Sequence, residues 1–119
     1  MSTLKNLLDE LTKIEGLIAA VVVSRDGFVV EGAMRGGGSV DMETMAAVIS
    51  AGVGSSEVMA RQLAVGELQL SMIECAQGMI VTVTLGEDAI MAVTADLDAK
   101  IGNIRYQLKK RLNDIIAAV

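Results

Sequence analysis

Few residues of this chain have the types and spacing that enzyme chemistry requires. Its 119 residues include no histidine and a single cysteine, Cys75. Neither a serine–histidine–aspartate triad nor a cysteine–histidine pair can therefore form, and a histidine-bearing zinc site is excluded as well. Cys75 has no CxxC partner and no possible intramolecular disulfide, so we interpret it as an ordinary thiol at a strand end and expect a cytoplasmic protein.

Two glycine-rich segments are candidates for binding phosphate. The segment 36–39 (GGGS) is not followed by the lysine that a P-loop needs, which favours a flexible connection. Gly52 and Gly54 begin a GxGxxG pattern, but Glu57 replaces the third glycine and no strand precedes the segment. We interpret these two glycines as a place where another helix approaches closely, with a simple helix kink as the alternative.

The carboxylates form no convincing metal site. Asp96 and Asp98 have the spacing that begins a calcium loop, but Lys100 and Gln107 occupy later ligand positions. The sequence therefore predicts that Asp96 caps a helix, and we expect no catalytic residue, no cofactor and no metal ion. An enzyme of unrecognised type is a minor alternative.

Composition and charge indicate one domain, spanning residues 1–119, with surplus apolar surface. The chain is 52% hydrophobic but 2% aromatic, and its net charge is −5. Residues 96–119 differ, with five basic and three acidic side chains. The acidic body argues against nucleic-acid binding. The basic run 109–111 is typical of a solvated helix end that complements the helix dipole, with an anionic surface as the alternative. No segment predicts a signal peptide or a transmembrane helix.

Hydrophobic periodicity predicts the order α-β-β-α-β-β-β-α. An Asp-Gly turn at residues 26–27 and two further hairpin-length connections indicate a five-stranded, mainly antiparallel sheet with helices on both faces. Predicted helices cover residues 3–14 and 41–64, with Asp41 as N-cap of the second, and a third follows Asp96. Predicted strands cover residues 17–24, 28–33, 67–75, 79–84 and 89–94.

The middle helix, residues 41–64, is apolar on more sides than one sheet can cover. Met45, Ile49 and Val53 share one helical stripe, and Val48 and Met59 widen it. Such a helix is expected to pack against its own sheet on one side and against a partner on another.

Three segments carry a family resemblance. In chain order they are GLIAAVVVSRDGFVVEG (residues 16–32), MIVTVTLGEDAIMAVTAD (79–96) and KIGNIRYQLKKR (100–111). Placed around an Ala- and Met-rich helix, they resemble the Roadblock/LC7 family of dynein light-chain-like domains, in its MglB-like prokaryotic branch. The resemblance implies a non-catalytic, profilin-like α/β sandwich that homodimerises through its middle helix and the following strand.

The resemblance also implies a function. Family members serve as platforms for Ras-like small GTPases or as light chains of larger assemblies, so we expect a homodimeric adaptor for such a GTPase. The alternative is a self-associating scaffold or accessory subunit with no preference for a nucleotide state. Together with the two-sided helix, the resemblance predicts an interface on Met45, Val48, Ile49, Gly52, Val53, Ser56, Met59, Ala60, Leu68, Leu70 and Met72.

Overall fold

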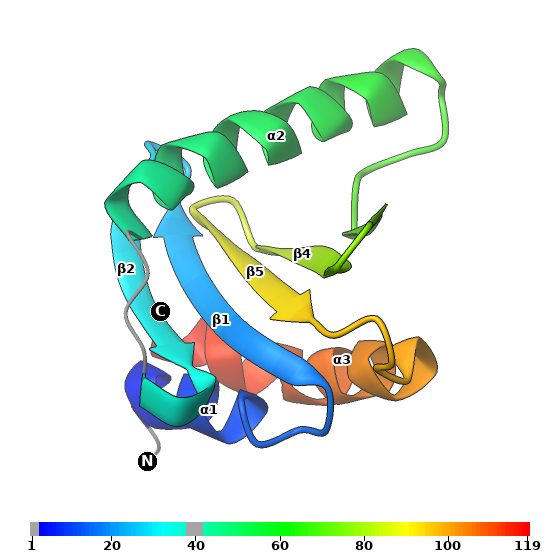
Figure 1. Ribbon diagram of the computed structural model, residues 1–119. Coiled ribbons are helices and arrows are strands. Elements are labelled where there is room, and N and C mark those ends of the chain that lie inside the picture. The colour runs from blue at the N-terminus through cyan, green and yellow to red at the C-terminus, as the bar shows by residue number, and fades with distance from the viewer. Residues whose placement is uncertain (1–2, 38–41) are drawn as a thin grey trace.

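A computed structural model describes residues 3–37 and 42–119 (Figure 1). The predicted order of helices and strands is confirmed, with one added turn of 3-10 helix, η1, after the second strand. Asp41, and with it the end of the predicted glycine-rich connection, lies outside the described residues. The elements are α1 (Leu4–Leu11), β1 (Leu17–Ser24), β2 (Val29–Met34), η1 (Arg35–Gly37), α2 (Met42–Gln62), β3 (Leu70–Cys75), β4 (Gly78–Leu85), β5 (Ala89–Ala95) and α3 (Ile101–Ala118).

The five strands form one antiparallel sheet in the order β2-β1-β5-β4-β3. Three connections are hairpins. At the centre of the sheet, β1 pairs with β5, so the first and last strands in the sequence are neighbours. The continuous apolar run of β1 fits this central place, because both faces of the strand are covered. β2 and β3 are the edge strands, and β3 follows α2 along the chain.

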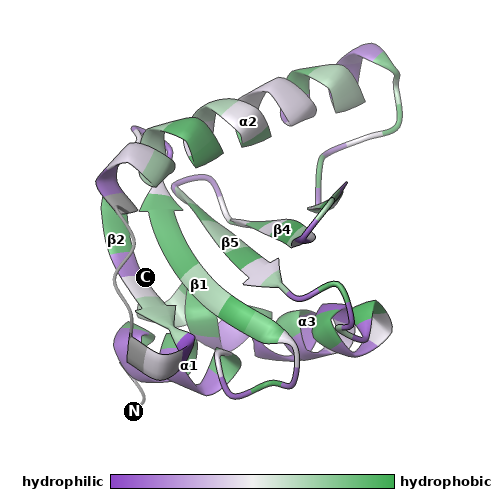
Figure 2. Ribbon diagram, in the orientation of Figure 1, coloured by the Kyte–Doolittle hydropathy of each residue, from purple (hydrophilic) through white to green (hydrophobic). Residues whose placement is uncertain are grey.

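The larger core lies between the sheet and the two terminal helices, α1 and α3. Leu8 and Leu11 of α1 and Ile104, Leu108 and Ile115 of α3 are almost completely buried against alternate residues of the strands. Figure 2 shows this amphipathic pattern, with apolar residues gathered on the strands and polar ones on the outer turns of the helices. The apolar residues that recur every second position in the strands therefore pack against those that recur every three to four positions in the helices.

A smaller core lies on the opposite face, under α2. Ala46 and Val53 of the helix pack on Val21, Ile90 and their neighbours in the sheet. The β1–β2 turn also touches this helix, because a Cβ atom at Gly27 would lie 3.4 Å from Cα of Ala47. Gly27 has φ +89°, which only glycine adopts without strain, so the predicted Asp-Gly turn serves both the hairpin and the helix contact.

The last helix corrects two predictions. It begins at Ile101 with Lys100 as N-cap, so Asp96 does not cap it. Asp96 instead donates its N–H to the carbonyl of Gly16 at 2.8 Å, and its carboxylate lies 3.8 Å from Arg35. The basic run 109–111 falls in the middle of this helix, with no basic residue in the last turn, and therefore does not complement the dipole at its end.

None of the helices in the described ranges is long and apolar enough to cross a membrane.

The larger core gives a direct stability prediction. Leu8→Ala should lower the free energy of unfolding by about 2–5 kcal/mol, because it leaves a cavity at a fully buried site. Leu97→Ala is the matched control: Leu97 is 54% exposed, and its truncation should change stability by less than about 0.5 kcal/mol. Urea denaturation followed by circular dichroism measures both, and equal losses would contradict the assigned core.

Candidate functional site

The two halves of α2 have different environments. Its first part, up to Val53, packs on the sheet, with Ala46 and Val53 buried. Its second half extends beyond the sheet, as Figure 1 shows, and leaves Val58 and Met59 exposed, as is Leu63 directly after the helix. Exposed apolar side chains this close together make this surface a candidate for contact with another molecule.

A polar network holds the overhanging half in place. The guanidinium of Arg25, in the β1–β2 turn, donates to the carboxylate of Glu57, and both side chains are mostly buried. Ser50 donates its hydroxyl to the carbonyl of Arg25 at 2.5 Å, and the N–H of Arg25 reaches the carbonyl of Asp88 at 3.1 Å. The network therefore ties two hairpin turns to α2 at the point where the helix leaves the sheet.

An apolar hollow of about 280 Å³ opens beneath the first half of α2. Met45, Val48 and Ile49 line it from the helix, and Met34 and Ile80 line it from the sheet. Its surface is almost wholly apolar, so it offers few groups that could orient a polar small molecule. The hollow is suited to apolar side chains from another polypeptide.

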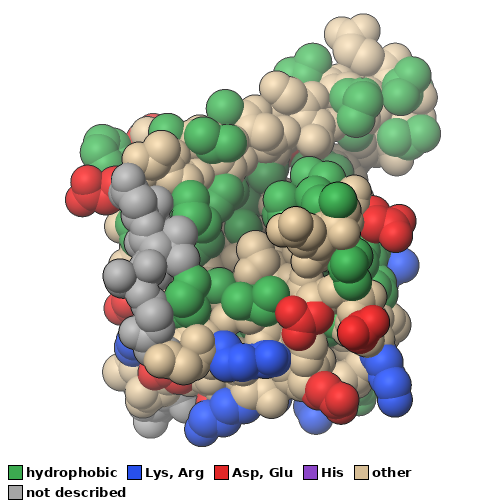
Figure 3. Space-filling model, in the orientation of Figure 1, with side chains coloured by type: hydrophobic (Ala, Val, Ile, Leu, Met, Phe, Trp, Pro, Cys, Tyr) green, Lys and Arg blue, Asp and Glu red, His purple; other side chains and the backbone are tan. Residues whose placement is uncertain are grey.

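The edge strand β3 continues this surface. No described strand pairs with its outer edge, and Met72 and Ile73 are exposed on its two faces. At the opposite edge of the sheet, the ammonium group of Lys5 in α1 donates a hydrogen bond to the carbonyl of Gly32 in β2. Figure 3 shows hydrophobic side chains on the overhanging helix and on the sheet below it. An open, apolar edge favours pairing with another strand.

The predicted interface residues divide by exposure. Val48 is 67% exposed and Met59 is 58% exposed. Gly52 is also exposed, and no atom lies within 4 Å of where its Cβ would be. The single chain therefore leaves space at Gly52 for another helix to approach closely. Met72 is exposed too, and the partly buried members of the set are Met45, Ile49, Ser56, Ala60, Leu68 and Leu70.

Two of the predicted interface residues pack against the core under α2 in the single chain. Val53 is only 3% exposed and packs on its own sheet, so it presents no surface to a partner. Leu68 lies before β3, which begins at Leu70. Leu68 packs in the core under α2, whereas Leu70 packs against the core on the other face.

The sequence reasoning also missed part of the surface. Val58 and Ile73 were not assigned to it, although both are exposed beside assigned residues. Alternation along β3 is the signal for Ile73, since it lies on the face opposite Met72. Met34 and Ile80 line the hollow from strands far apart in the sequence, and no local pattern indicates that they meet.

Comparison with known proteins identifies the family. Residues 3–95, from before α1 to the end of β5, match the Roadblock/LC7 domain. The chain belongs to the Roadblock/LC7 family. The final helix α3 lies outside the matched residues.

Two relatives in Methanocaldococcus jannaschii, the uncharacterized proteins MJ0310 and MJ1340, are each 36% identical to this Roadblock/LC7 chain over 111 residues, 93% of it and 95% of the relative. Among solved structures, Myxococcus xanthus MglB superposes with a TM-score of 0.88 at 18% identity, covering 96% of this chain and 92% of MglB. A Roadblock/LC7 domain from Streptomyces avermitilis gives 0.85 at 21% identity, covering 96% and 95%. These likenesses confirm the fold.

The Arg25–Glu57 pair should stabilise the domain measurably. We expect a double-mutant cycle with Arg25→Ala and Glu57→Ala to give a coupling energy of about 1 kcal/mol in urea denaturation, because the pair is largely screened from water. The control cycle combines Glu57→Ala with Arg61→Ala. Arg61 lies one turn away and is exposed, with no ion pair to a described carboxylate. A coupling near zero in the first cycle, or equal coupling in both, would contradict this role.

Proposed function

We propose that this Roadblock/LC7 domain is a homodimeric, non-catalytic adaptor that binds a Ras-like small GTPase. The observation that carries the proposal is the continuous apolar surface formed by the exposed side of α2, the hollow beneath it and the open edge of β3. A cytoplasmic protein would leave such a surface uncovered only at a cost in solubility, so a partner is expected.

The first partner in this proposal is a second copy of the chain. Two α2 helices crossing near Gly52 would approach closely, because no side chain stands at that position and the space around it is open. Antiparallel pairing of two β3 strands would satisfy both open edges, and a two-fold axis uses the same surface on each copy. Self-association has a parallel in a solved structure titled "MglB with tetrameric arrangement", which superposes with a TM-score of 0.84.

The second partner is the GTPase, which the family resemblance implies. No group of three or more metal-ligating side chains occurs among the described residues, and the chain contains no histidine. An adaptor of this kind would supply no reacting group. It would act by holding the switch loops of the GTPase in one arrangement, to an extent set by its different affinities for the two nucleotide states.

The dimer can be tested with two matched glycine substitutions. Light scattering of the wild type should give twice the mass of one 12.4 kDa chain. Gly52→Glu should give a monomer or an aggregate, because it places a charge at the proposed helix crossing. Gly102→Glu, at an exposed position of α3 that is equally open, should leave the dimer mass unchanged. A wild-type monomer at micromolar concentration would refute the interface.

GTPase binding distinguishes the adaptor from the scaffold. The chain should be titrated, by calorimetry, with a Ras-like GTPase of the same organism loaded either with GDP or with a non-hydrolysable GTP analogue. The adaptor hypothesis predicts affinities that differ by about tenfold or more, equivalent to about 1.4 kcal/mol. Equal affinities would support the scaffold alternative, and no binding in either state would refute the GTPase partnership.

A further inference from the structure

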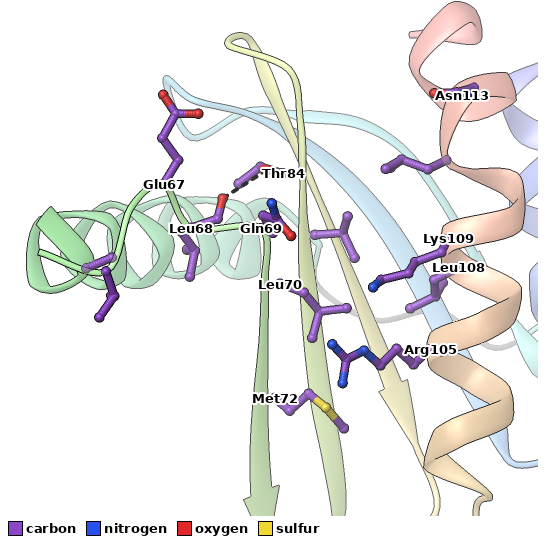
Figure 4. A pocket seen from close by; sticks show the side chains of 14 residues that line it. Glu67, Leu68, Gln69, Leu70, Met72, Thr84, Arg105, Leu108, Lys109 and Asn113 are labelled. Atoms are coloured by element: carbon purple, nitrogen blue, oxygen red, sulfur yellow. Dashed lines mark hydrogen bonds between the residues drawn. The ribbon is translucent and has the colours of Figure 1, made fainter.

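A larger groove lies on the other face of the sheet, between β3 and α3, with a volume of about 1090 Å³. It exists because α3 packs against β4, one strand in from the β3 edge. Leu70 and Met72 therefore face an open space, and Figure 4 shows both side chains directed toward α3. Together with Leu112 of α3 they give the groove an apolar floor.

Two cations form the wall that faces this floor. Arg105 and Lys109 lie one turn apart on α3, and Figure 4 shows both side chains reaching from the helix toward the β3 edge. Neither forms an ion pair with a carboxylate of the described residues. Glu67 is the carboxylate that lines the described groove, and it lies at the far end near Thr84 with its side chain directed away from the two cations.

These cations are notable in a chain of net charge −5. Unpaired positive charge beside an apolar floor is complementary to a segment that is acidic on one side and apolar on the other. The volume is slightly above the range of about 300–1,000 Å³ for small-molecule sites, which favours a polypeptide occupant. The four-residue spacing of Arg105 and Lys109 matches acidic side chains four apart on a helix lying alongside α3.

We propose that this groove binds an acidic amphipathic helix of a partner protein, with Arg105 and Lys109 pairing its carboxylates and the floor covering its apolar stripe. The mode is a helix lying in a groove. Arg105 and Lys109 lie outside the predicted dimer interface, but the groove shares Ala60, Leu68, Leu70 and Met72 with that interface. The light-scattering test of the dimer is therefore run beside the peptide test, so that failure of one proposal can be told from failure of the other. A flat lipid surface would reach the cations but not the floor.

The test uses a fluorescein-labelled helical peptide of about 18 residues, long enough for five turns, with Glu at every fourth position beside a leucine stripe. A second peptide replaces each Glu with Lys. Fluorescence anisotropy should show the acidic peptide binding the full chain and the basic peptide binding at least about tenfold more weakly. Added salt should weaken the acidic peptide's binding, because the cations are partly exposed.

Neighbouring lysines provide the matched variants. Lys109→Glu should weaken binding of the acidic peptide by about tenfold, whereas Lys110→Glu, exposed on the same helix but outside the groove, should change it by less than about twofold. Equal effects, or no preference for the acidic peptide, would overturn the proposal. So would binding to vesicles of phosphatidylcholine and phosphatidylserine without binding of the peptide. Light scattering of both variants separates this outcome from failure of the dimer.

Discussion

The position of α2 across the sheet is the constraint on which the rest of this structure depends. The helix has apolar side chains around most of its circumference, but one sheet of five strands covers only its first half. Burial of Ala46 and Val53 fixes the helix on the sheet, and the Arg25–Glu57 pair joins the second half of the helix to the β1–β2 turn. The uncovered half is the source of the apolar surface on which the proposed dimer rests.

The two faces of the sheet divide structural and binding roles. On one face, α1 and α3 complete the larger core and pack against β1 and β5 at the centre of the sheet. On the other face the smaller core leaves a hollow and an open strand edge. Binding surfaces of this kind need a rigid support, because a flexible one would lose more conformational entropy on association.

Charge is distributed unevenly over these surfaces. The chain is acidic overall, but the last helix carries a basic run whose members face different directions. Lys109 lines the groove beside β3, while Lys110 is exposed outside it. Because such cations are screened in water, their effect depends on the apolar floor beside them, which the edge strand supplies. The same strand thus contributes to both proposed binding surfaces through opposite faces and its open edge.

Sequence patterns alone determined the order of elements, the antiparallel hairpins and the presence of a helix with more apolar surface than one sheet needs. These features are local: a period of 3.6 or 2 residues and an Asp-Gly turn can be identified without knowing the fold. The tertiary structure decided which apolar residues remain exposed to solvent. Val48 and Val53 look alike in sequence, but the sheet covers only Val53. Leu68 and Leu70 pack against different cores, and β3 begins only at Leu70. Arg25 meets Glu57 across 32 residues of sequence, and a contact at that separation is set by packing rather than by any local pattern.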